Sequence, residues 1–154
     1  MSIDLQKMAF RFLGGKCNKI CTPALVQTET FFHYGKNTAC VTAKLTTNND
    51  TIERMKMVNA SEYAEASWIS VLESLRFSLE KGFTCINIEH NDSHVVKSLL
   101  YPTKRRQKLF VPHYKYKILT LADSSEQTAI RWNPNTHNEN DYLTDLSIQH
   151  VLKE

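Results

Sequence analysis

Three consecutive segments in which apolar and polar side chains alternate constrain the possible folds of this chain most strongly. They are residues 24–32, 38–47 and 51–58. Short segments connect them, residues 33–37 and 48–50, and both are rich in residues that favour turns. Alternation with a period of two predicts strands that bury one face, and short connections join antiparallel neighbours. We therefore expect residues 24–58 to form a three-stranded antiparallel meander.

The rest of the chain alternates helix-like and strand-like segments. Residues 61–81 carry an apolar stripe at helical spacing, with Ser61 in a favourable N-cap position and Gly82 to end the helix. The patterns then predict a strand at 83–90, helices at 92–101 and 116–122, a strand at 128–134 and a last helix at 138–152. Strands that follow helices can join the sheet in parallel through right-handed crossovers. The predicted fold class is therefore α/β, a mixed five-stranded sheet of a three-stranded meander and two parallel strands, with helices on both faces.

The composition is that of one globular domain. The chain has 154 residues, of which 42% are hydrophobic and 23% are charged, which excludes disordered and collagen-like proteins. Residues 1–22 are interpreted as an N-terminal leader segment, helix-like up to residue 20, and residues 23–154 as the domain. No apolar run approaches the roughly 20 residues of a membrane span, and the start lacks the apolar segment of a signal peptide. We expect an intracellular protein that is not secreted, does not enter a membrane and keeps its cysteines reduced.

Asp92 lies where the strand predicted at 83–90 meets the helix predicted at 92–101, and two interpretations of it remain open. As an N-cap, its carboxylate accepts backbone N–H groups and suits the positive end of the helix dipole. As a metal ligand, it lies at the carboxyl edge of the sheet, where open α/β folds place their ligands.

A stretch of basic and aromatic residues spans positions 101–117. It contains no acidic residue, and its cations are Lys104, Arg105, Arg106, Lys108, Lys115 and Lys117. This distribution is uneven, because the net charge of the whole chain is only +3. Clustered cations with interleaved aromatic side chains favour contact with nucleic acid. The other interpretation is a solvated loop whose aromatic side chains enter the core.

Three stretches, in this order, resemble the ribonuclease H-like superfamily. NASEYAEASWISVLESL (59–75) is similar to the family's first long helix, INIEHNDSHVVKSLL (86–100) to its fourth strand and following helix, and residues 118–147 to its closing unit. The resemblance implies the ribonuclease H fold and a metal-dependent nuclease that hydrolyses the RNA strand of RNA–DNA hybrids. It implies Mg²⁺ or Mn²⁺ as cofactor, since two metals held by carboxylates from separate elements activate water and stabilise the leaving oxygen.

The resemblance also implies which residues carry the chemistry. The candidate catalytic residues are Glu29, Glu62, Glu65, Asp92, Asp141, Asp145 and His137, and the candidate metal ligands among them are Glu29, Glu65, Asp92 and Asp145. Glu29 replaces the family's first aspartate, and Thr144 takes the aligned position of its last aspartate. On the long helix, Glu62 matches the motif, whereas Glu65 is closer in phase with the buried stripe. His137 matches a loop histidine that helps the product leave.

Six residues are candidate nucleic-acid contacts by the same resemblance. Lys104, Arg105, Arg106 and Lys108 lie where some members carry a basic protrusion. The family's glycine-rich first turn is missing here, and Tyr34 and Lys36 could substitute for it by stacking and by phosphate contact. Two alternatives to an active nuclease remain. One is a catalytically inactive domain of this fold that binds nucleic acid or serves as a structural subunit of a larger assembly, and Glu29 and Thr144 favour it. The other is an adaptor that binds proteins through the same sheet.

Overall fold

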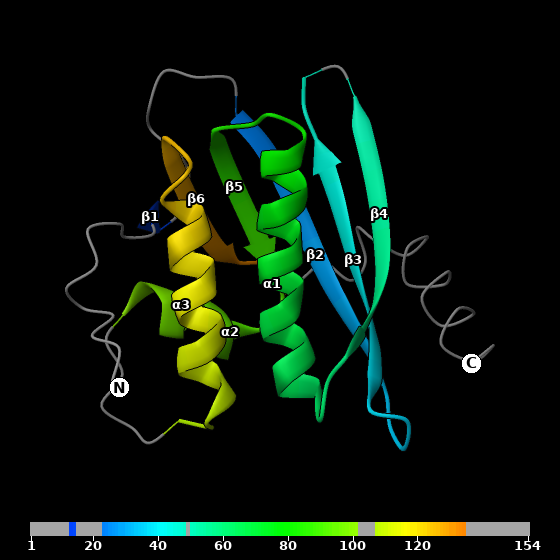
Figure 1. Ribbon diagram of the computed structural model, residues 1–154. Helices are drawn as coiled ribbons and strands as arrows, with labels where there is room; N and C mark the ends of the chain where they lie inside the picture. The colour runs from blue at the N-terminus through cyan, green and yellow to red at the C-terminus, as the bar shows by residue number, and fades with distance from the viewer. Residues whose placement is uncertain (1–12, 15–22, 49, 102–106, 135–154) are drawn as a thin grey trace.

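The computed structural model describes residues 13–14, 23–48, 50–101 and 107–134 (Figure 1). The strands of this part of the chain are Leu13–Gly14 (β1), Pro23–His33 (β2), Thr38–Thr46 (β3), Thr51–Asn59 (β4), Cys85–His90 (β5) and Gln127–Trp132 (β6). Its helices are Tyr63–Glu80 (α1), Ser93–Leu100 (α2) and Phe110–Ala122 (α3). All strands belong to one sheet in the order β1-β6-β5-β2-β3-β4.

The pairing of the strands confirms the predicted fold class. β2, β3 and β4 form the antiparallel meander, β5 pairs in parallel with β2, and β6 pairs in parallel with β5. The short strand β1 pairs in parallel with the free edge of β6, an addition that the sequence did not predict. Leu13 and Gly14 are therefore extended, whereas the sequence indicated a helix there.

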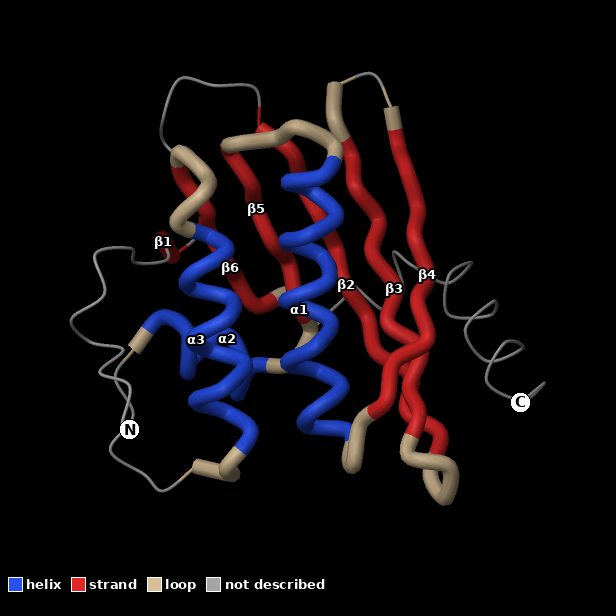
Figure 2. The backbone as a smooth tube through the Cα atoms, in the orientation of Figure 1, coloured by secondary structure: helices blue, strands red, loops and turns tan. Residues whose placement is uncertain are grey.

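The described helices cover one face of the sheet (Figure 2). α1 and α3 lie beside each other over the central strands, and all three helices contribute side chains to one apolar core cluster with the sheet. The last predicted helix, residues 138–152, lies outside the described residues. Helices on the opposite face therefore stay a prediction.

Alternation along the central strands decides which side chains enter this core. Val26 of β2 and Ile86 and Ile88 of β5 point toward the helices and are buried to 1% exposure or less. Because neighbouring residues of a strand point to opposite faces, Glu29 and Glu89 lie on the other side of the sheet. Both carboxylates are buried, with 5% and 2% exposure.

Helix α3 begins earlier than predicted, at Phe110 instead of residue 116. Pro112 lies in its first turn, where a missing backbone N–H breaks no intrahelical hydrogen bond, so the proline starts the helix instead of preventing it. The helical conformation carries Phe110 and Tyr114 to the core, against which both pack. Tyr101 and Tyr116 remain 63% and 42% exposed. The loop interpretation of this stretch is therefore wrong from Phe110 onward, although two of its aromatic side chains do pack against the core.

The cysteines differ from the expectation that all of them are reduced. Cys40 is buried with a free thiol, but Cys85 in β5 is disulfide-bonded. A two-residue alternation shows that a cysteine is buried and does not show whether its sulfur is bonded. No helix in the described ranges is long and apolar enough to cross a membrane.

Candidate functional site

The carboxyl ends of the central strands and the beginnings of the three described helices lie in the lower half of the molecule in Figure 1. The chain passes there from β5 into α2, and the β2–β3 turn and the first turns of α1 and α3 lie at the same end. Open α/β sheets bind ligands at this edge. We call this region, defined by Glu29, Tyr34, Tyr63 and Asp92, the carboxyl-end site.

Asp92 is the N-cap of α2. Its backbone is extended, with φ −98° and ψ 105°, and its Oδ1 accepts a hydrogen bond from the backbone N–H of His94 at 3.0 Å. The prediction that Asp92 caps the helix is therefore confirmed. The cap hydrogen bond occupies one carboxylate oxygen, so the metal-ligand interpretation stays a proposal.

Tyr63, the first residue of α1, lies within electrostatic reach of Asp92 and Glu29. Burial raises the pKa of Tyr63, and the negative charges of Asp92 and then Glu29 raise it further. Both charges therefore act on the same phenol. Tyr63 was not among the residues predicted for the site, although the sequence contained a signal, because it is the tyrosine of the Glu-Tyr pair that carried the family resemblance.

The two glutamates at the start of α1 both contact side chains in or next to α3. Glu62 forms an ion pair with Lys108, just before α3. Glu65 accepts hydrogen bonds from the Tyr114 hydroxyl at 2.9 Å and from the backbone N–H of Ser61 at 2.6 Å. Glu65 therefore caps the start of its own helix and fastens it to α3. Ser61, expected as the N-cap, donates to this cap, and Glu62 occupies the N-cap position.

These contacts change the acidity of both partners. Burial opposes ionisation of Glu65, but hydrogen bonds from Ser61 and Tyr114 outweigh it and lower the pKa of Glu65. Burial and the Glu65 carboxylate together raise the pKa of Tyr114 to about 12. Glu65 is therefore held as a structural anion between two helices.

A fully buried histidine, His90, lies beneath the carboxyl-end site at the end of β5. Its Nδ1 is 2.8 Å from Thr28 Oγ1, and its Nε2 is 2.8 Å from Ser67 Oγ. Thr28 Oγ1 donates to Ser70 Oγ at 3.2 Å, and Ser70 Oγ donates to the Ser67 carbonyl at 2.7 Å. Thr28 therefore accepts from His90, which places the ring proton on Nδ1 and makes Nε2 the acceptor for Ser67.

The hydrogen bonds of this network connect β2, α1 and β5 beneath Asp92. Burial lowers the pKa of His90 to about 4, although the nearby charge of Asp92 acts in the opposite direction. The ring is therefore neutral at pH 7, and every polar atom of it has a partner. The sequence indicated only the end of a strand at His90, because the hydroxyl partners come from distant segments.

The β2–β3 turn presents an aromatic and a basic side chain at the same end. Tyr34 is 77% exposed, and its ring contacts the edge of Phe32 at a centroid distance of 5.0 Å. Gly35 and Asn37 adopt positive φ values of 95° and 51°, which glycine and asparagine tolerate. The exposed Lys36 lies between them. Tyr34 and Lys36 are thus accessible to a ligand.

The remaining predicted residues divide into two groups. Lys104, Arg105, Arg106, His137, Asp141 and Asp145 lie outside the described residues. Lys108 is described and pairs with Glu62. Within the described ranges, no group of three His, Cys, Asp or Glu side chains could hold a metal ion. Two hard cations need several carboxylates from separate elements, so the described residues alone do not make a two-metal site.

Solved structures resemble the described architecture over most of the chain. Ribonuclease H1 from Halobacterium salinarum matches with a TM-score of 0.65 and 16% identity, covering 80% of this chain and 98% of its own. The N-terminal ribonuclease H domain of a Mycobacterium tuberculosis protein matches with a TM-score of 0.68 and 13% identity, covering 85% and 99%. A ribonuclease H1 isolated from compost, solved in complex with an RNA/DNA hybrid, matches with a TM-score of 0.68 and 14% identity, covering 84% and 99%.

No protein-family model and no curated protein sequence matches the chain. The TM-scores of 0.65 to 0.68 establish a shared fold, and at identities of 13 to 16% a shared fold does not imply a shared activity. The architecture, the order of its elements and these structural matches agree with the resemblance drawn from the sequence, and the chain has the ribonuclease H-like fold.

Proposed function

We propose that this chain binds nucleic acid duplexes at its carboxyl-end site and does not hydrolyse them. The observation that carries the proposal is the placement of Tyr63 within reach of both Asp92 and Glu29, while Glu62 and Glu65 engage α3. A phenol with a raised pKa is neutral at pH 7 and is a poor ligand for Mg²⁺ or Mn²⁺, which prefer carboxylates. The first turns of α1 therefore supply an aromatic side chain where hydrolysis needs a third anion.

Charge and aromatic character at the same end support binding. Tyr34 and Lys36 are exposed on the β2–β3 turn, and Lys104, Arg105 and Arg106 precede α3 in the sequence. Cations neutralise phosphates, and exposed aromatic rings stack on bases. A structural neighbour was solved with an RNA/DNA hybrid, which makes the hybrid the first duplex to test.

A metal-dependent nuclease is the second candidate, and one observation favours it. Glu29 and Asp92 come from separate elements, and the negative charge of each raises the pKa of the same phenol, Tyr63. Asp141 or Asp145 would complete a Mg²⁺ or Mn²⁺ site, with His137 helping the product to leave. Hydrolysis of the RNA strand of an RNA–DNA hybrid would then need Glu29 to serve in place of an aspartate.

Binding is tested by the salt dependence of affinity for a fluorescein-labelled RNA–DNA hybrid, measured by anisotropy. Each lost phosphate contact lowers the slope of log K against log salt by roughly 0.9. We expect the double variant Arg105→Gln/Arg106→Gln to bind more weakly, with a slope reduced by between about one and two.

The control is Lys44→Gln/Lys81→Gln, which removes the same charge from β3 and from the far end of α1. The proposal predicts an affinity and a slope close to wild type for this control. Equal losses in both double variants would mean that only net charge attracts the hybrid. Absence of binding by the wild-type chain would contradict the proposal and favour the adaptor.

A further inference from the structure

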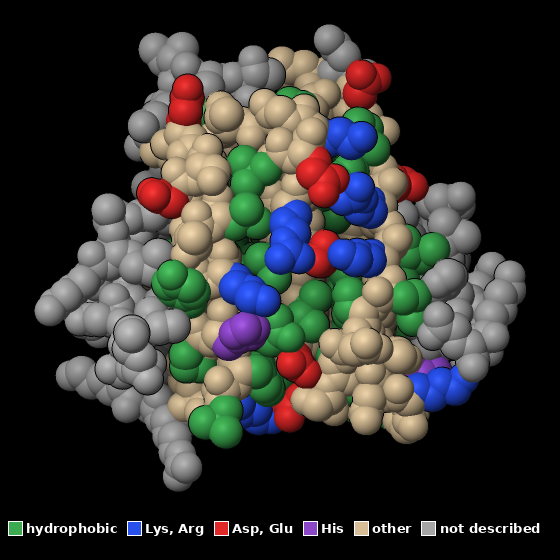
Figure 3. All heavy atoms as spheres, viewed as in Figure 1, with side chains coloured by type: hydrophobic (Ala, Val, Ile, Leu, Met, Phe, Trp, Pro, Cys, Tyr) green, Lys and Arg blue, Asp and Glu red, His purple; other side chains and the backbone are tan. Residues whose placement is uncertain are grey.

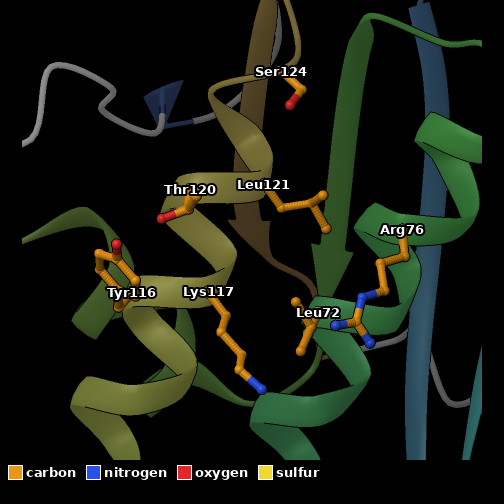
Figure 4. A pocket seen from close by; sticks show the side chains of 7 residues that line it. All are labelled: Leu72, Arg76, Tyr116, Lys117, Thr120, Leu121 and Ser124. Carbon is orange, nitrogen blue, oxygen red and sulfur yellow. The ribbon is translucent and has the colours of Figure 1, made fainter.

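A groove between α1 and α3 lies on the helical face, away from the carboxyl-end site. Its volume is about 320 Å³, within the range of about 300 to 1,000 Å³ for ligand sites. Leu72 and Leu121 form its apolar floor, and Arg76 and Lys117 lie at its sides (Figure 4). Tyr116 of α3 also lines it. The α1 residues come from the second half of that helix, whereas the carboxyl-end site uses its first turn. A duplex at the lower end and an occupant of this groove therefore contact different parts of α1.

The rim of the groove is cationic. In Figure 4 the Arg76 and Lys117 side chains reach from their two helices toward Leu72. Arg76 Nη1 donates to Glu73 Oε1 at 2.9 Å, but Glu73 also binds Lys56 Nζ at 3.2 Å through its other oxygen. Lys117 forms no ion pair with any acidic side chain in the described ranges. The Glu73 carboxylate thus pairs with two cations, Arg76 and Lys56. Lys117 lies across the groove as a third cation.

A second hollow continues this surface toward β4. It has a volume of about 350 Å³ and shares Arg76 with the groove. Arg54 and Lys56 of β4 line it, paired with Glu80 and Glu73 of α1. Lysine and arginine side chains accordingly gather near the centre of the helical face in Figure 3. Four cations against two carboxylates leave this surface positive, so it complements an acidic partner.

The apolar floor of the groove indicates which class of acidic partner fits it. Leu72 is 4% exposed and Leu121 is half-buried, so the bottom of the groove is aliphatic and can seat a large apolar side chain. Only Tyr116 supplies an exposed ring, and the carboxylates of Glu73 and Glu80 interrupt the cations. A nucleic-acid backbone favours an uninterrupted basic track with stacking platforms. A peptide segment that alternates carboxylates with a bulky apolar residue fits the groove better.

We propose that the α1–α3 groove docks an acidic segment of a partner protein. A large apolar side chain of the segment rests on Leu72 and Leu121, and neighbouring carboxylates pair with Lys117 and Arg76. A carboxylate between these two side chains relieves the repulsion of their like charges. This proposal does not depend on the function proposed for the carboxyl-end site, and both sites can be occupied together.

The test selects phage-displayed random dodecapeptides on the full chain, followed by anisotropy measurements with the labelled peptides recovered. We expect the recovered peptides to carry Asp or Glu beside Leu, Met, Phe or Trp. Lys117→Glu should weaken their binding about tenfold, the usual scale for reversing one charge of an interface pair. Lys81→Glu makes the same charge change outside the groove and should leave affinity within about twofold of wild type.

Three results would overturn the proposal. They are the recovery of no peptide above background, recovery of peptides without acidic residues, and equal affinity for wild type and Lys117→Glu. Melting curves of Lys117→Glu and Lys117→Gln exclude a loss of fold as the cause of weaker binding. A hybrid affinity that falls in Lys117→Glu while peptide affinity does not would assign the groove to nucleic acid instead.

Discussion

His90 and Asp92 are two residues apart and lie in contrasting environments. The His90 ring is fully buried in a closed network of hydroxyls, whereas Asp92 is half-buried and caps a helix. The buried network fixes the end of β5, and the end of β5 in turn places Asp92 within electrostatic reach of Tyr63. The buried residues that position the carboxyl-end site are thus distinct from the residues at its surface.

The first prediction at this scale concerns pH. The His90 pKa is about 4 in the folded chain and roughly 6.5 in the unfolded chain. The unfolded chain therefore binds the extra proton between these values, so the stability contribution is complete above about pH 6.5 and is lost as pH falls toward 4. We expect a loss on the order of 3 kcal/mol over this range, measured by urea denaturation.

The difference between wild type and His90→Gln isolates this contribution, because other groups titrate alike in both. His94→Gln is the matched control, since His94 is exposed on α2. Identical pH dependence of wild type and His90→Gln would show that His90 is not held neutral by burial.

The second prediction concerns the cap at Asp92. Asp92→Ala removes the acceptor for the His94 N–H and should lower the free energy of unfolding by about 1 kcal/mol. Asp92→Asn keeps a good cap and should stay within about 0.5 kcal/mol of wild type. Chemical denaturation at pH 7 compares the three chains. Equal destabilisation by Ala and Asn would mean that the carboxylate charge, and not the cap hydrogen bond, stabilises this junction.

At the scale of elements, the packing of α1 on α3 decides where the helix glutamates point. α3 begins at Phe110, so its second turn brings Tyr114 within reach of Glu65, and Lys108, just before the helix, pairs with Glu62. A helix that began at residue 116 would leave Tyr114 in a loop. The misplaced start of α3 therefore explains why the sequence did not predict these two contacts.

The hydrogen bond from Tyr114 to Glu65 is a measurable part of this packing. Tyr114→Phe keeps the ring and removes a charge-assisted hydrogen bond of 2.9 Å, so we expect a loss of about 1 to 2 kcal/mol of stability. Tyr116→Phe, on the same helix with its side chain 42% exposed, is the control and should cost less than about 0.5 kcal/mol. Thermal or urea denaturation of both variants measures the two losses of stability. Equal effects would show that the Glu65 contact does not fasten α1 to α3.

At the scale of the whole molecule, sequence patterns predicted the sheet because strand alternation is a local property. The meander and the parallel strands follow from period-two segments and from the helices that precede the later strands. The position of Asp92 followed in the same way from a strand–helix junction. The role of Tyr63, the hydroxyl partners of His90 and the disulfide at Cys85 did not follow, because each depends on contacts between segments far apart in sequence.

The most direct test of the central claim is a cleavage assay on a labelled RNA–DNA hybrid, in Mg²⁺ and then in Mn²⁺. Wild type and Asp92→Asn are prepared identically from a host without ribonuclease H activity, and the asparagine preserves the cap of α2. The account predicts equal, background-level product from both chains, although the wild type binds the hybrid. Cleavage by the wild type that Asp92→Asn abolishes would contradict it and make the carboxyl-end site that of a nuclease.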